Sequence, residues 1–131
     1  MAQELFGSSW RSKLDALAGA LRSVHKALID STRRDYEKAH GPIANPYALF
    51  ALVANDPAFA WLQPMTRAIV EIEDVLGRKT PSIEQPDHAR AQESLRDLLE
   101  GDGFGTTYRA RLLDDPRVAA LHGALRPFIL R

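Results

Sequence analysis

The sequence predicts an all-α protein, a compact single-domain bundle with one long N-terminal helix and four to six shorter helices. Three observations support this fold class. Apolar residues from Trp10 to Leu28 recur at alternating spacings of four and three, which is the period of one helix face. The pairs Asn45-Pro46, Asp56-Pro57 and Asp115-Pro116 each join a capping residue to a first-turn proline. No useful stretch alternates apolar and polar residues, as a half-buried strand does.

Size and composition are those of one globular domain. The chain of 131 residues fits a single domain, 1–131, in which we expect residues 1–7 to be a flexible N-terminus. It contains no cysteine, which excludes disulfides and thiolate chemistry. We expect no secretory signal, and no apolar run approaches the roughly 20 residues that cross a bilayer. We therefore expect a cytoplasmic protein without a membrane role.

The charge balance argues against a nucleic-acid partner. The 17 basic and 17 acidic residues give a net charge of zero, whereas a protein that binds phosphate backbones carries a basic face. We therefore expect no nucleic acid among the partners.

The first helix is the clearest element of the chain. Ser8 or Ser9 is the predicted N-cap, and Gly41-Pro42 is a strong stop, because glycine takes the left-handed cap and proline cannot extend the helix. This pattern predicts one helix of about thirty residues, with a break near Asp30 to Thr32 as the alternative. The apolar stripe consists of Trp10, Leu14, Leu17, Leu21, Val24 and Leu28.

Prolines and glycines divide the rest of the chain into shorter helices. Residues 77–86 are the predicted linker loop, and Gly101 to Gly105 is the predicted loop before a helix capped by Thr106 or Thr107. The predicted helices cover 46–55, 57–62, 64–76, 86–100 and 106–113, with a last one from Pro116.

Residues 41–66 stand out because Asp56 is their only charged residue. The segment carries four of the ten aromatic side chains, Tyr47, Phe50, Phe59 and Trp61. A charge-poor aromatic segment is normally covered by the rest of the molecule. We therefore predict that it forms part of the core, with Trp61 buried.

Several short phrases resemble a group of small, uncharacterised bacterial helical proteins. The central one is Asp-Pro-Ala-Phe-Ala-Trp-Leu at 56–62, and the similarity runs over about 40–123. The resemblance implies a bacterial, cytoplasmic, helical protein, and it brings no activity, cofactor or catalytic residue. The other phrases are His40-Gly41-Pro42, Gln63-Pro64, Ile69 to Ile72, Tyr108-Arg109, Asp115-Pro116 and His122-Gly123.

Candidate chemistry is sparse and gathers near the end of the first helix. Glu37 and His40 form a Glu-x-x-His pair, but di-iron bundles use two such pairs and two further glutamates, so we expect no metal site. In the last helical turn, His40 is well placed to bond free carbonyls. A ligand pocket near Tyr36, His40 and Trp61 is the alternative. No residue is assigned as catalytic, and no cofactor is expected.

Two classes of function stay open. The first is a non-enzymatic interaction or regulatory module whose partner is a protein or a second copy. The second is a small-ligand or metal-binding helical protein, including an enzyme, with the pocket near Tyr36, His40 and Trp61. The first is favoured because no catalytic constellation is present. A thirty-residue helix would be about 45 Å long, so we expect part of its stripe to remain for a homodimer contact.

Overall fold

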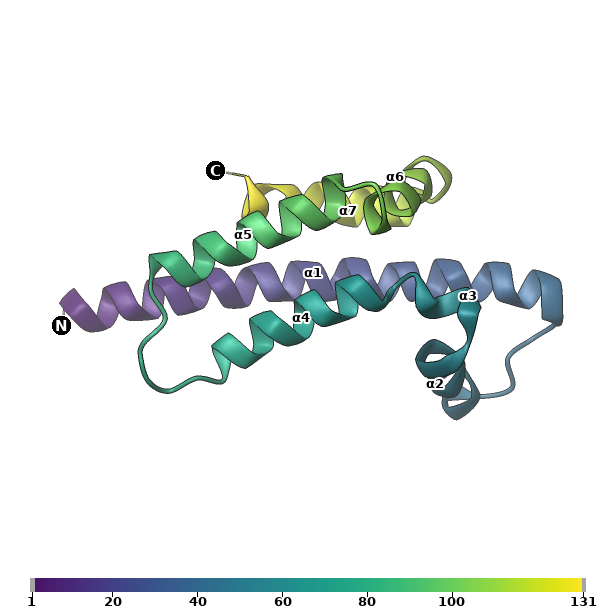
Figure 1. Ribbon diagram of the computed structural model, residues 1–131, viewed down its shortest axis with the longest axis horizontal. Helices are drawn as coiled ribbons and strands as arrows, with labels where there is room; N and C mark the ends of the chain where they lie inside the picture. Colours follow the sequence, from purple (N-terminus) through teal and green to yellow (C-terminus); the bar gives the residue numbers. More distant parts are fainter. Residues whose placement is uncertain (1, 131) are drawn as a thin grey trace.

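The computed structural model describes the backbone of residues 2–130 and the side chains from Trp10 to Leu130. Seven helices and no strand occupy this range, which confirms the all-α fold with one long N-terminal helix and six shorter ones (Figure 1). The helices are α1 (Ala2–His40), α2 (Pro46–Asn55), α3 (Pro57–Ala60), α4 (Gln63–Leu76), α5 (Gln85–Glu100), α6 (Phe104–Asp114) and α7 (Pro116–Ile129).

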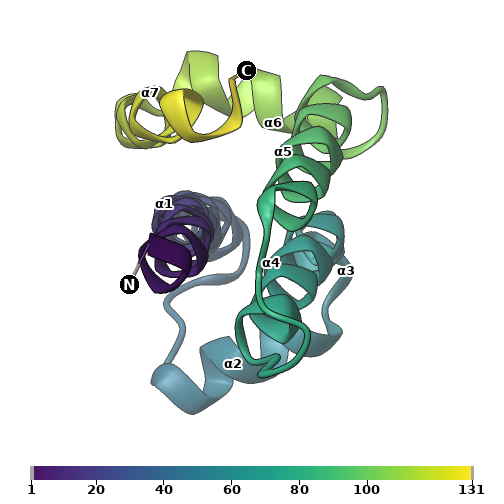
Figure 2. The same ribbon diagram turned by 90° about the vertical axis from the view of Figure 1, so that its left-hand side faces the viewer.

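Helix α1 is the central helix of the bundle, and α3, α4, α5 and α7 all pack against it. Viewed down its length, it has α7 on one side and the adjacent pair α4 and α5 on another (Figure 2). From Leu14 to Leu28 the predicted stripe is at most 1% exposed, and Trp10 is half-buried. The prediction that part of this stripe stays exposed for a homodimer contact is therefore wrong from Leu14 to Leu28, because the bundle itself covers these residues.

The first helix is unbroken. Thr32, at the alternative break, is buried, and its hydroxyl donates to the Leu28 carbonyl at 2.8 Å, so the helix satisfies this polar group internally. The backbone is already helical at Ala2, so the predicted cap at Ser8 or Ser9 is wrong. The flexibility expected for residues 1–7 stays a prediction. Gly41 ends the helix as expected, with a φ of +86° that favours glycine.

The three Asx-Pro pairs start helices as predicted. The side chains of Asn45, Asp56 and Asp115 accept hydrogen bonds from backbone amides of α2, α3 and α7 respectively. The helix predicted from Thr106 begins instead at Phe104, with Gly103 as its N-cap. Gly105 permits this start, because a Cβ there would lie 2.6 Å from the Leu99 carbonyl oxygen.

The predicted linker is a short ordered loop between α4 and α5. Arg78 donates to the carbonyl of Pro81 at 2.9 Å and to Asp87 Oδ2 at 2.9 Å. Ile83, only 2% exposed, anchors the loop to the core. The loop therefore joins two packed helices of one bundle.

Within the described part of the chain, none of the helices is both long enough and apolar enough to cross a membrane.

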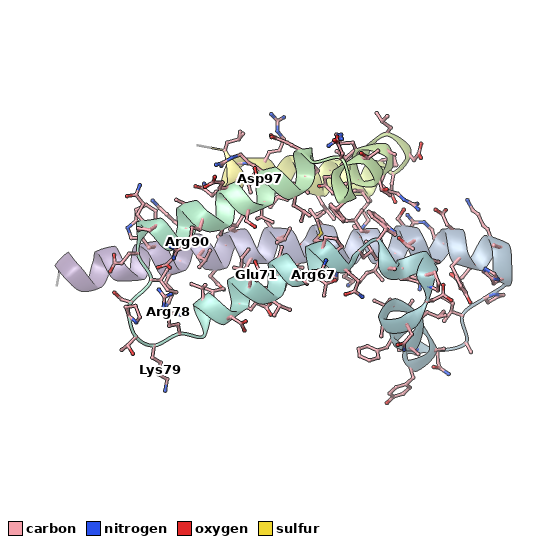
Figure 3. All side chains as sticks on the ribbon, in the orientation of Figure 1. Arg67, Glu71, Arg78, Lys79, Arg90 and Asp97 are labelled. Carbon is pink, nitrogen blue, oxygen red and sulfur yellow. The ribbon has the colours of Figure 1, made fainter. Side chains whose placement is uncertain are left out.

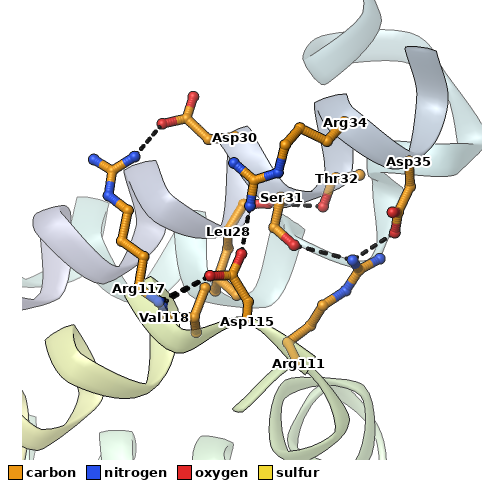
Figure 4. Close-up of polar contacts among 10 residues, drawn as sticks. All are labelled: Leu28, Asp30, Ser31, Thr32, Arg34, Asp35, Arg111, Asp115, Arg117 and Val118. Carbon is orange, nitrogen blue, oxygen red and sulfur yellow. Dashed lines mark hydrogen bonds and ion pairs between the residues drawn. The ribbon is translucent and has the colours of Figure 1, made fainter. Parts of the chain in front are cut away.

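A polar clamp holds the C-terminal helices on α1 (Figure 4). Arg117 reaches Asp30 at 2.9 Å, and Arg111 bridges Ser31 at 3.0 Å and Asp35 at 2.5 Å. These pairs join positions about eighty residues apart in the chain. The clamp fixes the far half of α1, which carries the candidate site on its last turn.

Candidate functional site

A cleft of about 620 Å³ lies at the end of the bundle, between the last turn of α1 and α2. Its size is within the range of small-molecule sites. The lining consists of Tyr36, His40, Gly41, Pro42, Ile43, Ala44, Ala48, Ala51, Leu52, Asn55, Asp56 and Pro57.

Local hydrogen bonds set the shape of this cleft. The amide of Gly41 donates to the Glu37 carbonyl at 2.8 Å, and Ile43 N–H donates to Glu37 Oε2 at 2.9 Å. At the other side, Asn45 Oδ1 accepts from Ala48 N–H at 2.9 Å and starts α2. The connection between the helices is thus hydrogen-bonded to residues of both α1 and α2.

An aromatic pair forms the α1 wall of the cleft. The rings of Tyr36 and His40 lie 4.4 Å apart between centroids, and Tyr36 also lies 5.9 Å from Phe59. Phe59 is fully buried, Tyr36 is half-buried and His40 is exposed. The three rings thus form a row that runs from the core to the solvent. Tyr36 and His40 both line the cleft, as predicted.

Trp61 does not belong to this pocket. Its ring stacks on Phe104 of α6 at 5.3 Å, with the Arg111 guanidinium 5.9 Å from its centroid. The side chain is half-buried, so the prediction of a buried Trp61 is wrong. The turn after α3 directs it toward α6, whereas Phe59, two residues earlier, takes the buried position.

The weak metal candidates are occupied in other ways. Glu37 accepts from Ile43 N–H and lies 3.7 Å from Arg33 Nε. His40 stacks on Tyr36. Among the described residues no group of three or more His, Asp or Glu side chains is placed to hold a metal ion.

The outer surface of α2 is the largest departure from expectation. None of the ten residues of α2 is buried, and Tyr47 and Phe50 are 87% and 76% exposed. The prediction that residues 41–66 form a covered core element is therefore wrong for α2, while Phe59, Leu62 and Met65 further along are buried as expected.

Two apolar faces explain this arrangement of α2. Leu49, Leu52 and Val53 pack against the core. The exposed face consists of Tyr47, Phe50, Ala51 and Ala54, at positions i, i+3, i+4 and i+7. This set is called the α2 face below. Helices that bind in grooves present anchors with this spacing, and the sequence signal for the face was its lack of charge.

The position of α2 in the fold leaves this face accessible. The helix packs chiefly against α3 and stands off one end of the bundle, opposite α5 to α7 (Figures 1 and 2).

Comparison of the chain with protein-family models, with curated proteins and with solved structures finds no match. The resemblance given by the sequence phrases stays a prediction.

Proposed function

We propose that the protein is a non-enzymatic interaction module that self-associates through the α2 face. The observation that carries this proposal is the solvent exposure of Tyr47 and Phe50 on a helix without a single charged residue. Exposed apolar surface concentrated on one element, unlike scattered apolar residues, is typical of a protein contact.

Charge favours a second copy as the partner. In a two-fold contact each residue can face its own counterpart, so like charges on the surface repel. Residues 41–55 contain no charged side chain, whereas α1, α4, α5, α6 and α7 all do. The α2 face is therefore well suited to meet its own copy.

Shape favours the same contact. Ala51 and Ala54 are small, so two α2 helices can approach closely between them. Tyr47 and Phe50 then cover the sides of the contact, and each aromatic ring can bury on the order of 150 Å² or more.

The expected affinity is modest. Two aromatic side chains supply roughly 300–400 Å², and a stable interface buries about 800 Å² per partner. The neighbouring uncharged segment 41–45 therefore contributes to the contact, and we expect a dissociation constant in the micromolar range.

Analytical ultracentrifugation between about 1 and 200 µM tests the proposal, a range that brackets the expected constant. The wild-type chain should convert from monomer to dimer. Phe50→Asp should weaken the dimer at least about tenfold while the circular dichroism spectrum is retained, because it places a charge in the contact.

Leu113→Asp is the matched control. Leu113 is 89% exposed on α6, so its replacement introduces the same charge at an equally accessible apolar site outside the α2 face. It should leave the dimer unchanged. A wild-type chain that stays monomeric at the highest concentration, or a Leu113→Asp variant as damaging as Phe50→Asp, contradicts the proposal.

The second candidate is a small ligand in the cleft between α1 and α2. Its volume of about 620 Å³ and the Tyr36–His40 pair on its wall favour this function. His40→Ala distinguishes the two candidates, because it changes the cleft wall and leaves the α2 face intact. A ligand site would lose affinity, whereas the dimer should persist.

A further inference from the structure

A second cleft, of about 430 Å³, lies between α4 and α5. Figure 3 shows Glu71 on α4 and Arg90 and Asp97 on α5. The cleft is separate from the α2 face and shares no lining residue with the cleft at α2. Its lining consists of Leu14, Ala68, Glu71, Ile72, Val75, Asp87, Arg90, Ala91, Glu93, Ser94, Leu95 and Asp97.

The floor of this cleft is apolar, and only a small part of it is accessible. Leu14, Ala68, Ile72 and Leu95 line it, and each is at most 9% exposed. So small an apolar surface is a poor match for the broad apolar face by which a partner helix docks in a groove. It suits a thin ligand such as an unbranched aliphatic chain better.

The rim carries an excess of negative charge. Asp87 pairs with Arg78 at 2.9 Å and with Arg90 at 2.7 Å, so these three side chains together carry one net positive charge. The other three carboxylates of the lining, Glu71, Glu93 and Asp97, form no ion pair with any side chain between Trp10 and Leu130.

The three carboxylates are distributed along the apolar floor. Glu93 and Asp97 are four residues apart on α5, about 6 Å along the helix axis. Glu71 belongs to the opposite wall, on α4. The cleft therefore offers an apolar track with negative charges on both sides.

We infer that this cleft binds an aliphatic polyamine. The methylene chain lies on the apolar floor, and the ammonium groups approach Glu71, Glu93 and Asp97. A four-carbon spacer is about as long as one helical turn, which matches the Glu93–Asp97 separation. The floor supplies the hydrophobic contribution and the rim supplies the charge complementarity, so neither a bare metal ion nor a neutral chain satisfies both.

Isothermal titration calorimetry on the full chain with spermidine, which has three ammonium groups, tests the inference. We expect saturable binding at micromolar to low millimolar concentration, with amide shifts in 68–75 and 87–97 by NMR. Mg²⁺, which has charge without a chain, and 1,8-octanediol, which has a chain without charge, should each bind at least about tenfold more weakly.

Two sets of variants separate the contributions of rim and floor. The double variant Glu71→Gln with Asp97→Asn should weaken spermidine binding about tenfold. Ser94→Phe should block the cleft while every carboxylate is kept. Asp74→Asn, an exposed carboxylate of α4 outside the cleft, is the matched control and should change the affinity less than about twofold.

Several outcomes would overturn the inference. These are no heat or amide shift at several millimolar spermidine, equal affinity for Mg²⁺, or amide shifts confined to other helices. Equal effects of Asp74→Asn and of the rim variants would likewise show that spermidine is attracted by the surface charge in general and occupies no specific site.

Discussion

Arg34 on α1 and Asp115 at the start of α7 form an ion pair, with 2.5 Å between Nη2 and Oδ2 (Figure 4). The same carboxylate accepts from Arg117 N–H at 2.9 Å and from Val118 N–H at 3.3 Å. The Asp115 side chain thus caps α7 and joins it to α1. Only 7% of this residue is exposed.

The first prediction concerns the charge of Asp115. Asp115→Ala removes both the cap and the ion pair and should lower the free energy of unfolding by about 2 kcal/mol, the upper end for a cap. Asp115→Asn keeps an oxygen for the amides and should cost about half as much. Urea denaturation of both variants measures the difference.

Asp56 is the matched control for this comparison. It caps α3 through Ala58 N–H at 2.9 Å and forms no ion pair with the described side chains. Asp56→Asn should therefore cost little, while Asp56→Ala costs on the order of 1 kcal/mol. Equal losses for Asn and Ala at position 56, or a harmless Asp115→Ala, would contradict the assigned roles.

The second prediction is a loss of stability between pH 7 and pH 5. Burial lowers the pKa of His25, His88 and His122 below 6.5, and Lys13 and Arg126 add to the effect at His88 and His122 respectively. Unfolded histidine has a pKa of about 6.5, so the unfolded chain binds more protons in this range. The stability contributed by these residues is complete above about pH 6.5 and falls as the pH drops through that value.

Urea denaturation at a series of pH values measures this effect. The triple variant with glutamine at positions 25, 88 and 122 should lose most of the dependence between pH 7 and pH 5. A slope that is the same in wild type and triple variant would show that other groups bind the protons.

A separate decline is expected in acid. Burial by itself raises the pKa of Asp115, but the amides of Val118 and Arg117 and the Arg34 charge outweigh it and hold the pKa below its usual range. The backbone amide of Glu84 and the Arg78 guanidinium likewise lower the pKa of Asp87 against the effect of burial. Both carboxylates stabilise the fold above about pH 4, and this contribution is lost as the pH falls through their folded pKa values.

The third prediction separates two aromatic side chains of the same turn. Phe59 is fully buried, so Phe59→Ala should cost about 3–5 kcal/mol. Trp61 is half-buried on Phe104, so Trp61→Ala should cost roughly 1–2 kcal/mol, less than its size suggests. Thermal and urea denaturation rank the two variants. A Trp61→Ala variant as unstable as Phe59→Ala would require Trp61 to be a core residue.

Local features of the fold were predictable from the sequence, because their causes lie within a few residues. The caps at Asn45, Asp56 and Asp115 and the stop at Gly41 are of this kind. The start of α6 was missed because it depends on how closely Gly105 approaches Leu99. The Arg117–Asp30 pair was out of reach, because its members are 87 positions apart.

The candidate site was predicted in part. Tyr36 and His40 share a face because they are one helical turn apart, and the structure places both in one cleft. Trp61 was assigned to the same pocket from the aromatic, charge-poor composition of residues 41–66. The direction of its side chain, however, depends on the turn after α3. The lack of charge in α2 indicated that the segment needs cover, and it did not indicate whether this chain or another one supplies it.

The fourth prediction tests the central proposal on stability and association together. Tyr47→Ala and Phe50→Ala should each change the free energy of unfolding of the monomer by no more than about 0.5 kcal/mol, because both rings are exposed. Both should weaken self-association. A large loss of monomer stability would place these rings in contacts within one chain.

The most direct test is a distance between two copies of α2. The chain has no cysteine, so Ala54→Cys introduces one unique spin label on the α2 face, and Ala110→Cys places a matched label on the exposed surface of α6. Double electron–electron resonance at about 200 µM, above the expected micromolar dissociation constant, should give a narrow distance near 20 Å for the label at position 54, because packed helices lie 8–10 Å apart and each label adds length. The label at position 110 should give a longer distance or none. No dipolar modulation at position 54, or a short distance only at position 110, would contradict self-association through the α2 face.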